Sequence, residues 1–161
     1  MSRVGVTGHQ DLSPKTQQLV SDALLALLEP DTCLVGLTSL ANGADQIFAR
    51  IVLELDGKIH AVVPSEAYGR AFPDEGSRAM YRSLLARASA VTLLPYPHPS
   101  EEAFVAAGRF IVDRSEKLVA IWDGAPAHGL GGTADIVGYA NRLGVPVVVI
   151  WPEGASRDEV E

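Results

Sequence analysis

Cysteine and long apolar runs are nearly absent from this sequence of 161 residues. Cys33 is the single cysteine, so the chain cannot form an internal disulfide, and a reducing compartment is its simplest setting. No apolar run reaches the roughly 20 residues that a membrane-spanning helix needs, and residues 1–10 lack the apolar core of a secretion signal. We therefore expect a soluble, cytoplasmic protein with no membrane partner.

Basic residues are outnumbered, with 13 Lys and Arg against 20 Asp and Glu, which gives a formal net charge of −7. The chain has no basic run, whereas binding to a nucleic-acid backbone or to an anionic membrane depends on clustered positive charge. We therefore expect no nucleic-acid partner. We also expect any bound phosphate to be held by local backbone donors.

Metal-ligand spacing and familiar catalytic motifs are also missing. The four histidines show no short-range pairing with one another or with Cys33. There is no Gly-x-Ser-x-Gly elbow and no Walker loop. We therefore expect no metal site and no resident cofactor.

A hydrophobic content of 47% with a charged content of 20% predicts one folded domain, which we assign to residues 1–152. Residues 153–161 are acidic with almost no apolar content, so we expect this tail to fray. Within the domain, apolar runs of strand length alternate with apolar residues at helical spacing. This alternation predicts an α/β fold, a single-domain, doubly wound (Rossmann-like), mostly parallel sheet with helices on both faces. The expected strands are residues 3–7, 33–38, 58–63, 90–94, 118–122 and 145–151.

Three polar turns, residues 7–9, 39–45 and 123–133, follow strands of this sheet. Because the carboxyl ends of parallel strands meet at one edge, where open α/β sheets bind ligands, we expect the turns to converge on one site. In the third turn, Gly131 and Gly132 precede a helix. The first amides of a helix are unpaired and attract anions, and glycines let a phosphate reach them. Glycine-rich loops before helices are also ordinary turns, so this motif alone leaves both interpretations open.

Asp45 and Tyr68 each have two interpretations. Asp45, in the first turn of a helix, either complements the helix dipole by about 0.3–1 kcal/mol or accepts from a ligand hydroxyl, as acidic residues do from ribose. Tyr68 and Phe72 lie in a polar loop, residues 65–75, that follows Pro64. The loop is either a lid whose ring stacks on a base or a segment that its aromatic residues anchor to the sheet.

Five short segments carry a resemblance as a set. They are Val-Thr-Gly-His at 6–9, Ser-Leu-Ala-Asn-Gly-Ala-Asp at 39–45, Ala-Val-Val-Pro at 61–64, Trp-Asp-Gly at 122–124 and Gly-Gly-Thr-Ala at 131–134. With them the chain resembles the SLOG superfamily, Rossmann-like nucleotide-binding domains related to DNA-processing protein A and to the lonely guy (LOG) cytokinin-activating phosphoribohydrolases. The match spans residue 4 to about 151. It implies a domain that binds nucleotides or nucleotide-derived molecules at the predicted edge and that commonly self-associates.

In some members of the superfamily the domain hydrolyses the bond between base and ribose phosphate. The LOG motif Pro-Gly-Gly-x-Gly-Thr-x-x-Glu ends on a catalytic glutamate; Gly132-Thr133 matches its Gly-Thr, and the glutamate position falls on Ile136. Isoleucine cannot stabilise an oxocarbenium ion or position water, so hydrolysis here requires another carboxylate. The candidates are Asp135, Asp45, Glu66 and Asp123.

Two functions therefore stay open: a nucleotide-binding or sensor domain, and an N-glycosidic phosphoribohydrolase acting on a nucleoside monophosphate. Only the second needs an acid–base carboxylate, for which Asp45 and Asp135 are the candidates. We expect a homo-oligomer, with the helices that carry Met80, Phe104 and Phe110 as the candidate contact face. The predicted ligand-binding residues are Thr7, Gly8, His9, Ser39, Asn42, Gly43, Ala44, Asp45, Pro64, Tyr68, Asp123, Gly131, Gly132 and Thr133.

Overall fold

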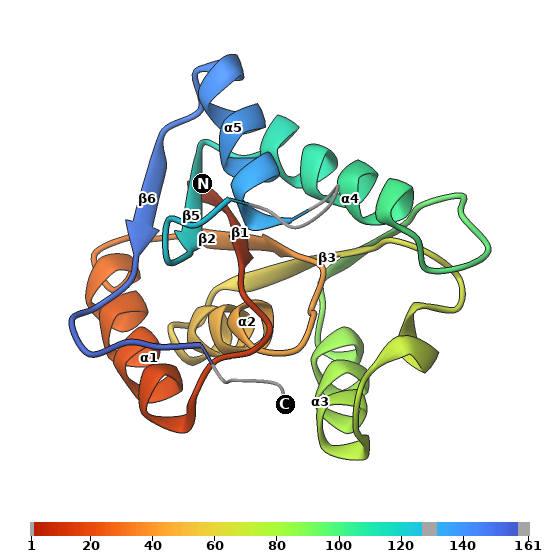
Figure 1. Cartoon of the computed structure of the whole chain (residues 1–161), viewed down its shortest axis with the longest axis horizontal. Helices are drawn as coiled ribbons and strands as arrows, with labels where there is room; N and C mark the ends of the chain where they lie inside the picture. The colour runs from red at the N-terminus through yellow and green to blue at the C-terminus, as the bar shows by residue number, and fades with distance from the viewer. Residues whose placement is uncertain (1, 127–131, 158–161) are drawn as a thin grey trace.

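Six parallel strands form one sheet in the computed structural model, which describes residues 2–126 and 132–157 (Figure 1). Their order across the sheet is β4-β3-β2-β1-β5-β6, and every neighbouring pair runs parallel. This confirms the predicted α/β sheet and shows it to be parallel throughout the described residues. The strands are β1 (Ser2–Gly8), β2 (Leu34–Thr38), β3 (Lys58–Val63), β4 (Ala90–Leu93), β5 (Lys117–Ile121) and β6 (Val147–Ile150).

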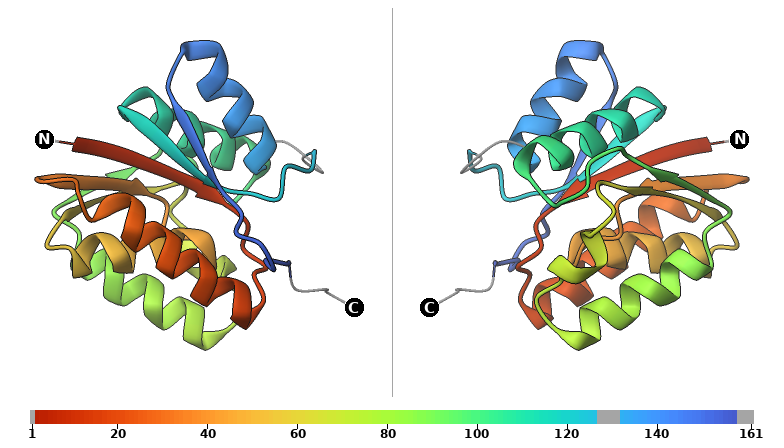
Figure 2. Two further views of the ribbon diagram at one scale, coloured as in Figure 1. Left: turned by 90° about the vertical axis from the view of Figure 1, so that its left-hand side faces the viewer. Right: turned by 90° about the vertical axis from the view of Figure 1, so that its right-hand side faces the viewer.

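Helices cover both faces of the sheet, with α1, α2 and α3 on one side and α4 and α5 on the other (Figure 2). Apolar side chains repeat at helical spacing along each of them, and this stripe faces the sheet. Among the described residues, none of the helices combines the length and the apolar character needed to cross a membrane. The bounds are α1 (Pro14–Leu28), α2 (Ala44–Glu54), α3 (Glu75–Ala86), α4 (Glu101–Asp113) and α5 (Thr133–Leu143), with a short 3₁₀ helix η1 (Tyr68–Ala71) before α3.

The order of the strands creates a switch point between β1 and β5. From β1 the chain steps outward through β2, β3 and β4, and it then returns through α4 to pair β5 with the other side of β1. The connections that leave β1 and β5 therefore run to opposite faces, α1 to one and α5 to the other (Figure 2). Such a divergence leaves a crevice at the carboxyl ends of the two strands.

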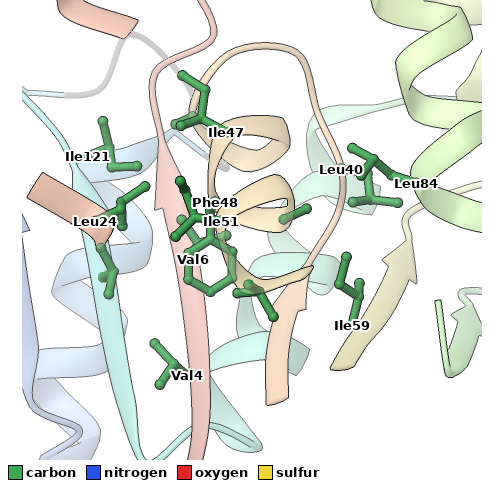
Figure 3. Packing of buried hydrophobic residues seen from close by; sticks show 14 of the residues in the cluster. Val4, Val6, Leu24, Leu40, Ile47, Phe48, Ile51, Ile59, Leu84 and Ile121 are labelled. Carbon is green, nitrogen blue, oxygen red and sulfur yellow. The ribbon is translucent and has the colours of Figure 1, made fainter. Parts of the chain in front are cut away.

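The larger apolar core lies between the sheet and the layer of α1, α2 and α3. Phe48 of α2 is completely buried there, and Figure 3 shows it with Ile51 over Val6 of β1. Gly36 on β2 makes room for this ring, because a Cβ at that position would lie 2.8 Å from Cε1 of Phe48. The packing thus sets α2 close against the centre of the sheet, which fixes where its first turn lies.

Helix starts fall into two groups. Ser13, Asp74 and Ser100 cap α1, α3 and α4, each accepting a hydrogen bond from a backbone N–H of the first turn. In contrast, the N-cap residues of α2 and α5 are Gly43 and Gly132, which provide no side-chain cap. The first turns of these two helices therefore keep amide groups that no capping side chain occupies.

The first part of the tail that the sequence led us to expect to fray makes contacts with the start of α1. The backbone N–H of Ser156 donates to Oγ1 of Thr16 at 2.7 Å, and its carbonyl accepts from the N–H of Ser13 at 3.3 Å. Arg157 forms an antiparallel bridge with Leu12. The chain up to residue 157 is therefore tied to the start of α1, and residues 158–161 lie outside the described residues.

Replacing Phe48 by alanine tests the core. The Phe48→Ala variant is expected to lose about 3–5 kcal/mol of unfolding free energy, because the buried ring leaves a cavity under α2. Urea denaturation measures this loss. The control is Leu143→Ala, which changes a side chain that is 52% exposed and is expected to cost about 0.5 kcal/mol or less. Equal stabilities of the two variants contradict the packing described here.

Candidate ligand-binding site

A cavity of about 550 Å³ opens at the carboxyl ends of β1 and β5. Its walls come from the turns after β1, β2, β3 and β5, from the starts of α2 and α5, from η1 and α4, and from residue 157 near the end of the described chain. The cavity therefore occupies the switch point, where the connections of two neighbouring strands diverge. Nine of the predicted ligand-binding residues line it: Thr7, Gly8, His9, Ser39, Asp45, Pro64, Tyr68, Gly132 and Thr133.

The remaining predicted residues lie elsewhere. Asn42 and Gly43 line a second cavity of about 410 Å³ between the starts of α1, α2 and α3. Ala44 is fully buried against Gly8. Asp123 lies beside His9, and Gly131 falls outside the described residues. Asn42, Gly43 and Ala44 therefore belong to the same edge of the sheet but not to the wall of the larger cavity.

Packing explains two of the glycines that the sequence assigns to ligand binding. A Cβ at Gly8 would lie 2.5 Å from Cβ of Ala44 and 2.9 Å from the carbonyl oxygen of Ile121. Gly43 has φ of +81°, and a Cβ there would lie 2.5 Å from the carbonyl oxygen of Gln10. Both glycines thus allow the turn after β1 to pack directly on α2 and β5, whether or not a ligand is bound.

His9 joins the turn after β1 to the turn after β5. His9 is 8% exposed, and its Nε2 lies 3.1 Å from both the backbone nitrogen and the Oδ1 of Asp123. The two contacts require different ring states, because Nε2 accepts from the N–H when it is bare and donates to the carboxylate when it is protonated. Burial raises the pKa of Asp123, but the N–H of Ala125 and the contact with His9 outweigh this effect and lower it overall.

Asp45 is a buried carboxyl group at the opposite wall, with only 8% of the residue exposed. Its Oδ2 accepts from the N–H of Ala41 at 3.3 Å. Burial raises its pKa to about 7, and the hydrogen bonds from Ala41, Ser39 and Thr38 lower it only in part. Asp45 is therefore divided between its protonated and ionised forms near neutral pH.

Tyr68 of η1 lies near this carboxyl group and is 5% exposed. Burial, followed by the charge of Asp45, raises the pKa of its phenol well above the ordinary value, so the hydroxyl stays protonated. The ring makes edge contacts with Phe72, Tyr81 and Phe104 at centroid distances of 5.3, 5.4 and 6.2 Å. Aromatic neighbours therefore anchor Tyr68, which also lines the cavity; stacking of its ring on a base stays a prediction.

The wall formed by α5 is apolar where the LOG motif has its glutamate. Ile136 is 3% exposed, lines the cavity and packs against Gly108 of α4. Asp135 is exposed and is not among the described residues that line the cavity. Of the four carboxylates put forward for hydrolysis, Asp45 is the one that lines the cavity, whereas Asp135, Glu66 and Asp123 are not among its described lining residues.

Several cavity residues carry no signal in the sequence. Glu101 and Phe104 come from α4, Gln10 and Asp11 follow the first predicted turn, and Arg157 belongs to the segment expected to fray. A helical apolar pattern predicts the buried face of α4 but not that its first turn reaches the edge of the sheet. Only the tertiary arrangement assigns these residues to the cavity.

Solved structures of the same fold match the chain, whereas no protein-family model and no curated protein matches it. DNA processing protein A from Streptococcus pneumoniae is 21% identical with a TM-score of 0.71, over 96% of this chain and 52% of that one. Its counterpart from Helicobacter pylori is 16% identical with a TM-score of 0.70, over 98% and 68%. A molybdenum cofactor binding protein from Rippkaea orientalis is 17% identical with a TM-score of 0.61, over 92% and 75%.

These matches confirm the SLOG-type fold that the sequence motifs indicate. At identities of 16% to 21%, they show the fold and nothing finer. The chain spans about half the length of the S. pneumoniae protein, 52% of it. The fold assignment therefore leaves the ligand to be argued from the cavity.

The prediction of no nucleic-acid partner is contradicted by these matches. The H. pylori structure describes a single-stranded DNA binding mode for a protein of this fold. The error lies in reasoning from the net charge of −7, because that sum covers the whole surface whereas phosphates are held by local donors. Net charge therefore does not exclude nucleic acid for this chain.

Replacing Gly8 by alanine separates packing from ligand binding. Without any ligand, Gly8→Ala is expected to lower the unfolding free energy by about 1–3 kcal/mol, because its Cβ overlaps Ala44 and the backbone of Ile121. The control is Gly138→Ala within α5, where only Nη1 of Arg142 comes near, at 3.5 Å; it is expected to add up to about 1 kcal/mol. A ligand-free Gly8→Ala protein as stable as the wild type contradicts the packing role.

The buried carboxyl of Asp45 predicts a pH-dependent stability. Its folded-state pKa of about 7 lies above the ordinary value of 3.8, so the folded protein holds a proton that the unfolded chain has lost. Stability therefore falls between about pH 4 and pH 7, by up to about 4 kcal/mol. The unfolding free energy of Asp45→Asn minus that of the wild type should increase with pH across this window and become constant above it. Urea denaturation at several pH values measures this difference. Asp135→Asn, an exposed control, should show no such trend; the same trend in both variants refutes the assignment to Asp45.

Proposed function

We propose that this chain binds a nucleotide, or a nucleotide-derived phosphate ligand, in the cavity at the carboxyl edge and acts as a sensor or binding domain. The proposal rests on one observation: two walls of different chemistry line the same cavity. One wall is the uncapped start of α5, and the other is the buried pair of Asp45 and Tyr68. The uncapped helix start suits a phosphate, and the wall of Asp45 and Tyr68 suits a sugar or a base.

The start of α5 suits the phosphate. Gly132 and Thr133 line the cavity, and Gly132 provides no side-chain cap to the first turn. Within the described residues, the first amide of α5 with a backbone partner is that of Asp135, which donates to the carbonyl of Gly132. The amides before it, together with the dipole of an 11-residue helix, favour an anion at this end.

The opposite wall suits ribose or base. Asp45 near its pKa can accept from a hydroxyl or donate to one, and the protonated phenol of Tyr68 adds a further donor and acceptor. Ser39 lines the cavity on the same side. A volume of about 550 Å³ is within the usual range of roughly 300–1,000 Å³ for small-molecule pockets.

Hydrolysis of the N-glycosidic bond is the second candidate function, and Asp45 is the observation that favours it. A carboxyl with a pKa of about 7 can exchange a proton near neutral pH, as general acid–base catalysis requires. Against it stands Ile136 at the position where the LOG motif has a glutamate. Binding without turnover is therefore the function that we favour.

Self-association also remains a proposal. Val91 and Leu93 on the edge strand β4 are each 53% exposed, and Phe104 is 37% exposed. Of the three aromatic or methionine side chains put forward from the sequence, Phe104 has the exposure required for a contact face. Light scattering of the purified protein measures the mass in solution.

Calorimetric titration with AMP, adenosine, ribose 5-phosphate and a single-stranded oligonucleotide tests the proposal. AMP is expected to bind to the wild type, and Asp45→Asn is expected to weaken it about tenfold, because a charge-assisted hydrogen bond to ribose is lost. Asp135→Asn, whose side chain lies outside the cavity, should bind as the wild type does.

Three results count against a binding domain for mononucleotides. No binding of AMP or ribose 5-phosphate rejects the proposal, and tighter binding of the oligonucleotide than of AMP replaces the small ligand by a nucleic acid. The third is turnover: free adenine in chromatograms of the AMP incubation, present with Asp135→Asn and lost with Asp45→Asn, identifies the protein as a hydrolase.

A further inference from the structure

The last described residues of the chain form part of the cavity wall. Residues 152–157 leave β6 and run beside the turn between β1 and α1, where Ser156 bonds to Ser13 and Thr16 (Figures 1 and 2). The hydroxyl of Thr16 is fully buried in this contact and donates to the carbonyl of Ser156 at 2.9 Å. These bonds place the following residue, Arg157, at the cavity.

Asp11 holds the guanidinium of Arg157 in a fixed orientation. Nε of Arg157 lies 2.8 Å from Oδ1 and 3.0 Å from Oδ2 of Asp11, and Nη2 lies 2.8 Å from Oδ1. A guanidinium has five N–H donors, and the contact with Asp11 uses those on one side. Within the described ranges, Nη1 has no hydrogen-bond partner. The guanidinium of Arg157 is therefore a donor that Asp11 orients, and its Nη1 has no partner within the described residues.

Positive charge is otherwise scarce around the cavity. Arg157 is the only arginine or lysine among its described lining residues, which include the three carboxyl groups of Asp11, Asp45 and Glu101. An anionic ligand in this surrounding needs a compensating cation, and a planar guanidinium suits phosphate oxygens best. The backbone amides that the sequence led us to expect as the sole phosphate donors are thus joined by a side-chain cation.

We propose that Arg157, oriented by Asp11, is a specificity-determining residue of the cavity that contacts the negatively charged group of the ligand. This inference rests on the proposed nucleotide function and assigns one residue to charge recognition. The ion pair with Asp11 spares the ligand the entropic cost of ordering a long side chain, because the side chain is already ordered. The C-terminal segment thereby supplies part of the binding site.

Calorimetric titration of Arg157→Gln with AMP, adenosine and inorganic phosphate tests the assignment. AMP affinity is expected to fall about tenfold, while adenosine affinity stays within about twofold, because only the charged group meets the guanidinium. Arg157→Lys should recover part of the loss. The AMP affinity of the wild type should also fall with added salt more steeply than that of Arg157→Gln.

Removing Arg157 also leaves the carboxylate of Asp11 without its partner, and this carboxylate would repel the negatively charged ligand. A double variant separates this repulsion from the loss of attraction by Arg157. In Asp11→Asn/Arg157→Gln that repulsion is gone, so a persistent loss of AMP binding supports contact with Arg157. Recovery to the wild-type affinity overturns it, as does equal AMP affinity of wild type and Arg157→Gln. An equal loss of adenosine and AMP overturns it too, because the side chain then acts only as a wall. Far-UV circular dichroism and thermal unfolding confirm that each variant is folded.

The two proposals fail in distinguishable ways. If the wild type binds none of the three probes, the proposed nucleotide function is rejected, and the role of Arg157 is rejected with it. If the wild type binds AMP and Arg157→Gln binds it equally, only the role of Arg157 is rejected.

Discussion

The pairing of β1 with β5 is the constraint on which the site depends. These neighbours run parallel, yet their connections lead to α1 on one face and α5 on the other, so in the part of the chain that the structure describes no helix covers the crevice at their carboxyl ends. Gly8 keeps this arrangement tight because its missing side chain lets β1, β5 and α2 meet at one point. The cavity therefore follows from the topology, and the glycine preserves the packing around it.

The two ends of the cavity differ in their electrostatic character. The first turn of α5 has no side-chain cap, whereas Asp45 lies buried at the start of α2, where burial raises its pKa to about 7. A carboxyl in that state lowers the stability of the folded protein at neutral pH, and perturbed groups of this kind concentrate in functional sites. The raised pKa of Asp45 therefore agrees with the binding role proposed above, which the dipole of α2 alone does not require.

Local patterns predicted the strands, the convergence of the turns and nine residues of the cavity wall, because strand ends and turns are encoded by neighbouring residues. They did not predict that Asn42 faces a second cavity while Asp45, three positions later, faces the first, since this depends on how the turn before α2 and the first turn of α2 pack in the tertiary structure. Arg157 was beyond prediction for another reason: it meets Asp11 across 146 positions of sequence, a contact that no local pattern encodes.

Ile136 is the physical reason why the LOG mechanism does not transfer directly to this cavity. Its side chain fills the space that Gly108 leaves on α4, so α4 and α5 approach closely through an apolar contact at the position where the LOG motif carries a glutamate. A carboxylate placed there would lose this contact and be buried against apolar atoms. Among the described residues of the cavity wall, carboxyl groups come instead from α2, α4 and the turn after β1, as Asp45, Glu101 and Asp11. Because Arg157 already engages Asp11, acid–base chemistry in this cavity would have to approach the ligand from the side of α2 or α4, which is a different geometry from that of the LOG motif.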